Sequence, residues 1–232
     1  MDKFLCERNI GTRSQVKTYI RQGLVTVNGK PATAADLKID ESSDIVTFQG
    51  RELHSQGFVY YMLNKPQGVV SATQDNTAKT VVELLKDCNL PRHGIFPVGR
   101  LDKDTEGLLL LTDDGELAHR LLSPKRHVDK TYLVTAEHPI SPEDIEKLER
   151  GVDIGDEHIT MPAKVSLKTD SVFYLTIHEG RFHQVKRMLQ AVDNRVTALK
   201  RTEFGGITLD EGLKPGEYRE LTEQEVTKLH EA

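Results

Sequence analysis

Several residue types are scarce in this sequence of 232 residues, and each scarcity excludes a class of protein. Cys6 and Cys88 are the only cysteines and stand far apart, which excludes a disulfide framework and argues against a structural zinc site. No apolar run approaches the roughly 18 residues that span a bilayer, so we expect no membrane association. The N-terminus shows no apolar core followed by a small-residue cleavage site. We therefore expect a cytoplasmic protein with reduced cysteines.

Basic residues are outnumbered, with 31 Lys and Arg against 36 Asp and Glu and a formal net charge of −5. This balance excludes a histone-like nucleic-acid binder. The basic residues nevertheless gather in three segments: residues 1–30 hold six against two acidic, 119–130 four against one, and 181–201 six against one. A single basic run is usually a solvated face, but three of them in an acidic chain favour a polyanionic partner.

The length allows a small domain followed by a larger one. Apolar spacing and glycine stops in the first 23 residues predict two short helices, followed by a strand over 25–27 and a tight turn at Asn28-Gly29. A further strand is expected over 45–48. The polar, glycine-bounded stretch 49–57 predicts a linker. We therefore expect a small domain over residues 1–57 and a second domain over residues 58–232.

Strand-like runs dominate the second part, at 58–63, 69–72, 95–98, 107–112, 131–136, 172–178, 196–200 and 218–221. Helices are expected between Ser141-Pro142 and Gly151, and again from the capping box that begins at Thr222. Strands in series with irregularly inserted helices predict an α+β fold with a largely antiparallel or mixed sheet.

The first candidate for chemistry is the acidic segment 99–107, which lies between two apolar strand runs. A carboxylate in such a loop, and Asp102 in particular, can act as nucleophile or base while the sheet holds it rigid. The same composition is also typical of an ordinary turn. The acidic residues do not indicate a metal site, because Asp113-Asp114-Gly115 reads as a turn and helix cap and no histidine stands at ligand spacing.

Two further segments carry candidate residues. Residues 179–188 turn from a strand into a cationic helix start, where Lys186 or Arg187 can hold a nearby carboxylate ionised or bind phosphate. His183 in this segment is interpreted as a solvated side chain, because a single histidine without a second ligand is seldom a metal site. Tyr132 lies on a predicted strand, where tyrosine is either core or a stacking platform for an unstacked base.

Together these segments resemble the motifs of the RsuA subfamily of RNA pseudouridine synthases, and the N-terminal part resembles an S4-like RNA-binding domain. The motifs that carry the resemblance are, in order, 64–68 (NKPQG), 99–108 (GRLDKDTEGL), 130–132 (KTY) and 179–188 (EGRFHQVKRM). The resemblance covers nearly the whole chain, and four ordered motifs are far more specific than one.

The resemblance implies a role for each candidate residue. Asp102 matches the catalytic aspartate, and it either attacks C1′ of the ribose or removes a 2′ proton to give a glycal. Lys186 is expected to pair with Asp102, with Arg187 as second choice, and Tyr132 is expected to stack on the flipped uracil. Predicted RNA contacts come from the residues Lys65, Arg100, Arg181 and Arg187. The isomerisation needs no cofactor and no metal.

Within the subfamily, the stretches 61–68, 125–127 and 181–187 resemble the synthases that modify uridine 516 of 16S rRNA. The expected partner is therefore 16S rRNA, either free or in an assembly intermediate with ribosomal proteins, and the expected state is a monomer. Arg13, Lys17 and Arg21 are expected to give the small domain its salt-sensitive RNA affinity. The alternatives are a synthase acting on 23S rRNA or tRNA, and a non-catalytic RNA-binding assembly factor.

Overall fold

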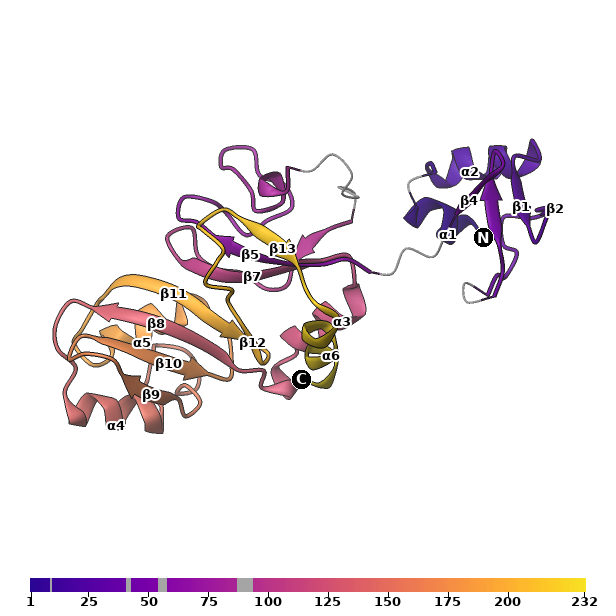
Figure 1. Cartoon of the computed structure of the whole chain (residues 1–232). Coiled ribbons are helices and arrows are strands. Elements are labelled where there is room, and N and C mark those ends of the chain that lie inside the picture. Colours follow the sequence, from indigo (N-terminus) through magenta and orange to yellow (C-terminus); the bar gives the residue numbers. More distant parts are fainter. Residues whose placement is uncertain (9, 41–42, 54–57, 87–93) are drawn as a thin grey trace. The chain divides into compact units, whose positions relative to one another are not determined.

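The computed structural model describes residues 1–8, 10–40, 43–53, 58–86 and 94–232. These residues divide into two compact units, one formed by the described residues of 1–58 with Gly94 and the other by residues 59–86 and 95–232 (Figure 1).

The first unit packs two helices on a small antiparallel sheet of order β2-β1-β3-β4. Its elements are α1 (Asp2–Glu7), α2 (Arg13–Arg21), β1 (Val25–Val27), β2 (Lys30–Pro31), β3 (Val46–Phe48) and β4 (Arg51–Leu53). Thr12 caps α2 in a capping box with Gln15. The predicted turn at Asn28-Gly29 is present, and both residues have positive φ. Leu5, Val16 and Val25 form the fully buried core.

The predicted linker over 49–57 is wrong in its first part. Residues 51–53 form β4, which pairs with β3 through a tight turn at Gln49 and Gly50, both of which have positive φ. Gln is not a residue type that signals such a turn, so the hairpin was hidden in the sequence. Residues 54–57 of the predicted linker lie outside the described residues.

The second unit is built on a nine-stranded mixed sheet of order β13-β5-β7-β11-β8-β10-β9, with β6 paired to β7 and β12 paired to β11. The strands are β5 (Tyr60–Lys65), β6 (Phe96–Pro97), β7 (Glu106–Thr112), β8 (Lys130–Ala136), β9 (Lys164–Leu167), β10 (Val172–Ile177), β11 (Val196–Phe204), β12 (Ile207–Thr208) and β13 (Tyr218–Glu220). All pairings are antiparallel except that of β11 with β7. The predicted α+β class with a mixed sheet is confirmed.

Helices cover this sheet in two groups. α3 (Gly115–Leu122) and α6 (Glu223–Glu231) lie side by side, whereas α4 (Pro142–Arg150) lies against β9 and α5 (Gln184–Gln190) against β11 (Figure 1). Short 3-10 turns occur at η1 (Val82–Leu84) and η2 (Pro124–Arg126). The predicted helix starts at Asp114, Ser141 and Thr222 are confirmed, because each of these side chains accepts a hydrogen bond from the first turn.

The central strands bury both of their faces. On β7, Leu109 and Leu111 join the apolar cluster that contains α4 and α5, while Leu108 and Leu110 join the cluster that contains α3 and α6. This is why 108–111 is an unbroken run of leucines. Residues 69–72, predicted as a strand, make only an isolated bridge between Val70 and Thr80.

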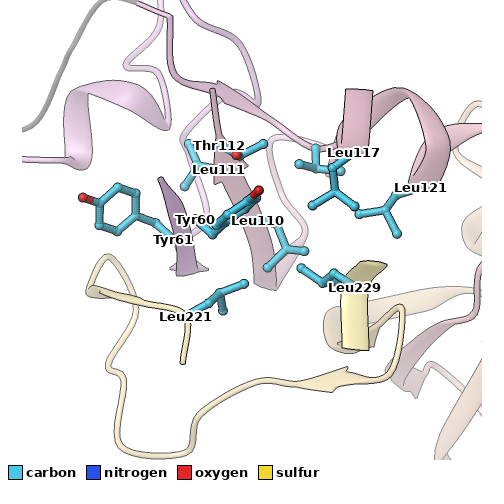
Figure 2. Close-up of a pocket in the computed structure, with 10 residues that line it drawn as sticks. Tyr60, Tyr61, Leu110, Leu111, Thr112, Leu117, Leu121, Leu221 and Leu229 are labelled. Atoms are coloured by element: carbon cyan, nitrogen blue, oxygen red, sulfur yellow. The ribbon is translucent and has the colours of Figure 1, made fainter. Parts of the chain in front are cut away.

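A small apolar cavity of about 10 Å³ lies between β5, β7, α3 and α6 (Figure 2). Figure 2 shows Leu117, Leu121 and Leu229 pointing toward the side chain of Leu110. The cavity is a packing gap under α6, near the smallest volume that holds a single water. None of the helices in the described ranges is long and apolar enough to cross a membrane.

Candidate active site

The candidate carboxylate, Asp102, lies in the loop between β6 and β7, and buried groups hold the backbone of this loop. Lys65, at the end of β5, is fully buried, and its Nζ donates to the carbonyl oxygens of Asp102 at 3.0 Å and Thr105 at 2.9 Å. The Ser71 hydroxyl donates to the Leu101 carbonyl at 2.9 Å and lies 3.1 Å from the Leu101 amide. Asp102 is therefore presented by a loop that is fixed on both sides of it.

The position of Lys65 differs from the RNA contact predicted for it. Burial lowers the pKa of its ammonium to about 8, although the nearby carboxylates of Asp104 and Asp102 oppose this effect. Because the side chain has no exposed surface, it holds the loop and presents no charge to a ligand. Sequence reasoning missed this because a fully buried lysine is rare.

The Asp102 carboxylate forms the ion pair that the sequence predicted. Its Oδ2 lies 2.9 Å from Nζ of Lys186, on α5, which also contacts Oδ1 of Asp104 at 2.6 Å. Burial acts to lower the pKa of Lys186, but hydrogen bonds to Asp104 and Asp102 outweigh it and raise that pKa. The Asp102 side chain keeps 29% of its surface exposed, so a substrate can reach it.

His183 contacts the other oxygen of the same carboxylate. Its Nε2 lies 3.5 Å from Oδ1 of Asp102, while its ring stacks on Phe182 with centroids 3.8 Å apart. The imidazole is 41% exposed, which agrees with the solvated side chain expected from the sequence. Its contact with Asp102 was not predicted. The available signal was the spacing of three residues between His183 and Lys186 in one motif, because such a spacing at a helix start can bring both side chains to the same carboxylate.

The two arginines of the same motif are engaged within the protein. Arg187 donates to Asp156 and to the carbonyls of Ile154 and Phe182, so it is not the partner of Asp102. Arg181 pairs with Glu179 and donates to two carbonyls of the loop before β9. Both side chains are 23% exposed. Their donors hold the loop 154–159 against α5. Contact of these two side chains with RNA stays a prediction.

Within the described part of the chain, no hydrogen bond or ion pair joins Asp102 to the remaining predicted residues. Tyr132, on β8, is only 8% exposed and belongs to the same apolar cluster as Leu101. Arg100 is exposed in the Asp102 loop. Stacking by Tyr132 and RNA contact by Arg100 stay predictions. In the other unit, Arg13, Lys17 and Arg21 are all exposed at i, i+4 and i+8 of α2, so they lie on one helix face.

The described residues contain no group of three His, Cys, Asp or Glu side chains that could hold a metal ion. They do contain a partly exposed carboxylate between an ammonium and an imidazole. A carboxylate that is oriented by a neighbouring cation can act as a nucleophile at a sugar carbon or as a base toward a sugar proton.

Residues 59–191 match the family model of RNA pseudouridylate synthases, and residues 1–46 match that of the S4 domain. The chain belongs to the RNA pseudouridine synthase family. It is 51% identical to an uncharacterized RNA pseudouridine synthase of Bacillus subtilis, over 100% of this chain and 98% of the relative. It is 43% identical to proteins named ribosomal small subunit pseudouridine synthase A in Vibrio cholerae and Escherichia coli, over 99% of this chain and 98% and 99% of theirs.

A crystal structure of a pseudouridylate synthase has the same architecture. It aligns with a TM-score of 0.71 and 41% sequence identity, over 98% of both chains. The family and the RsuA-type organisation, an S4 domain before a synthase domain, agree with the resemblance carried by the four motifs. The chain is therefore an RNA pseudouridine synthase.

Proposed function

We propose that this synthase isomerises a uridine of small-subunit ribosomal RNA, at position 516 in the standard numbering of 16S rRNA. The target is supported by relatives that are named for the small ribosomal subunit and that match this chain over almost its full length. The observation that carries the chemistry is the ion pair of Asp102 with Lys186 of α5, whose charged atoms lie 2.9 Å apart. The buried Lys65 holds the loop that carries Asp102.

Asp102 acts as the reacting carboxylate in the proposed mechanism. It either attacks C1′ while the N1–C1′ bond breaks, which gives a sugar ester, or it removes a 2′ proton, which gives a glycal. Both routes require an ionised carboxylate, and Lys186 pairs with that carboxylate and orients it. The detached uracil then turns and rejoins the sugar through C5. Tyr132 is proposed to stack on the uracil during this rotation.

The first unit supplies affinity for the RNA in this proposal. The exposed cations of α2 face solvent, and the S4-domain match covers them. We propose that the enzyme acts in the cytoplasm as a monomer and meets its target in an assembly intermediate of the small subunit. In a mature ribosomal particle, proteins and RNA folds restrict access to a base that must be flipped out.

The test is tritium release from 16S rRNA transcripts that carry tritium at C5 of uracil, followed by mapping of the modified site. The wild type should release tritium from one uridine, and Asp102→Asn should abolish release. Asp170→Asn, which changes an exposed aspartate in the turn between β9 and β10, is the matched control and should retain activity. Release from 23S rRNA or tRNA instead would overturn the target. Binding without release from any RNA would indicate a non-catalytic binding factor.

A further inference from the structure

His183 occupies the side of the Asp102 carboxylate opposite to Lys186. Lys186 contacts Oδ2 at 2.9 Å, and Nε2 of His183 lies 3.5 Å from Oδ1. The two carboxylate oxygens therefore face two different groups. The imidazole therefore lies beside the carboxylate that the proposed function makes the reacting group.

The orientation of this imidazole is fixed by its surroundings. His183 has a φ of +49°, a left-handed conformation that is uncommon for residues other than glycine and that places the residue just before α5. Its ring lies nearly parallel to that of Phe182, at an interplanar angle of 19°. Arg187 in turn holds the backbone of Phe182 by donating to its carbonyl at 3.1 Å. Arg187 and Phe182 thus hold the imidazole beside Asp102.

The reaction needs a proton acceptor after the new carbon–carbon bond has formed. When C5 bonds to C1′, C5 carries both the sugar and its original hydrogen, and the ring holds an N1=C6 double bond. The C5 proton must leave, the C5–H electron pair becomes the C5=C6 bond, and N1 takes up a proton. The net change is an isomerisation, with one proton lost at C5 and one gained at N1.

The groups around Asp102 differ in their capacity to accept this proton. Lys186 stays protonated, because its hydrogen bonds to Asp104 and Asp102 raise its pKa despite burial. The hydrogen bond from Lys186 lowers the pKa of Asp104, which makes that carboxylate a weak base. Imidazole is the side chain that most readily takes up and returns a proton near neutral pH.

We propose that His183 is a further catalytic residue, whose Nε2 accepts the proton from C5 of the rejoined uracil. The imidazolium passes this proton to water through its 41% exposed surface, and N1 takes up a proton from the solvent. The proposal rests on the pseudouridine synthase activity and on Asp102 as the reacting group. In this proposal His183 does not take part in breaking the N1–C1′ bond.

The test compares His183→Gln with His138→Gln, which changes an exposed histidine of the same unit. Glutamine can still hydrogen-bond to Asp102 but cannot accept a proton at neutral pH. Tritium release by His183→Gln should fall by about 100- to 10,000-fold, the usual range for loss of a general base. Deuterium at C5 should then slow the variant more than it slows the wild type. His138→Gln should match the wild type in both measurements.

A second substrate separates the proposed role from loss of folding or of positioning. RNA with 5-fluorouridine at the target has no proton at C5, so the rearranged adduct should form at wild-type rate with His183→Gln. Equal slowing on this RNA, or tritium release unchanged by the substitution, would overturn the proposal. All variants are tested on the RNA from which the wild type releases tritium. A wrong target would therefore change which RNA is used, whereas a wrong role for His183 would change only the result of the substitution.

Discussion

Lys65 is the residue whose substitution tests how the catalytic loop is held. Its buried ammonium donates to the carbonyls of Pro66, Asp102 and Thr105. In Lys65→Met these buried acceptors lose their donor, so we expect the free energy of unfolding to fall by about 2–4 kcal/mol. The rate of tritium release should also fall, because Asp102 loses its fixed position. Urea unfolding and initial rates measure the two effects.

The neighbouring Lys103 provides the control for this prediction. Lys103 is exposed in the same loop. Lys103→Met therefore removes a positive charge without taking a hydrogen-bond donor away from buried carbonyl groups. We expect its stability to stay within about 0.5 kcal/mol of the wild type. If the two variants behaved alike, the buried ammonium would not be what holds the loop.

Single residues also show where sequence reasoning succeeds and fails. The pair of Asp102 and Lys186 could be predicted, because both stand in motifs specific enough to imply their contact. The burial of Lys65 and the contact of His183 with Asp102 could not, because each depends on packing between segments far apart in the chain. A charge in the sequence does not say whether its partners will be RNA phosphates or backbone carbonyls.

At the scale of elements, capping signals were more informative than apolar runs. Asp114, Ser141 and Thr222 each cap the start of a helix as predicted, because a cap is a local hydrogen bond. The apolar run 69–72 failed as a strand, since pairing requires a neighbour that only the fold supplies. β9 was not predicted, and it is an edge strand with largely exposed side chains and little periodic signal.

The last helix is attached to the sheet by an ion-pair network that predicts a pH dependence. Arg219, on β13, donates to both oxygens of Glu225 on α6 at 2.8 Å and to Asp210 at 2.7 Å. Hydrogen bonding from Arg219 lowers the pKa of Glu225 to about 2, from an ordinary value of 4.5. A carboxyl with a lowered pKa stabilises the fold above pH 4.5, and this contribution is lost as the pH falls toward 2.

We therefore expect Glu225→Gln to lower the free energy of unfolding by about 1–3 kcal/mol at pH 7. The difference from the wild type should shrink between pH 4.5 and pH 2, where the wild-type carboxyl takes up its proton. Glu223→Gln, on the exposed first turn of the same helix, is the control and should change little. Urea unfolding at pH 7, 5 and 3 measures the effect, and a difference that is constant with pH would contradict it.

At the scale of the whole molecule, the S4 domain and the synthase domain fall into different units. The family models assign the S4 domain to residues 1–46 and the synthase to 59–191, and the structure divides the described residues between two units in the same order. The net charge of −5 does not reveal that the basic residues of the two units have different surroundings. The cations of α2 are exposed along one face, whereas those of α5 are held by Asp102, Asp104 and Asp156 around the site.

This separation predicts that neutralising α2 weakens binding but spares the chemical step. A variant with Arg13, Lys17 and Arg21 changed to Gln should bind 16S rRNA more weakly, because fewer counterions are released from the phosphates. The slope of log affinity against log salt should become less steep by about 2, as expected for two to three lost phosphate contacts. Tritium release at saturating RNA should stay near the wild-type rate, since Asp102 and Lys186 lie in the other unit.

The matched control for this variant changes two exposed cations of α4, Lys147 and Arg150, to Gln. Both already pair with acidic residues one turn away, so their charges are compensated within the helix. We expect them to leave affinity and salt slope unchanged, as measured by filter binding from 50 to 200 mM salt. An α2 variant with an unchanged slope would mean that this face does not touch phosphate. A fall in the saturated rate would mean that α2 also positions the RNA for catalysis.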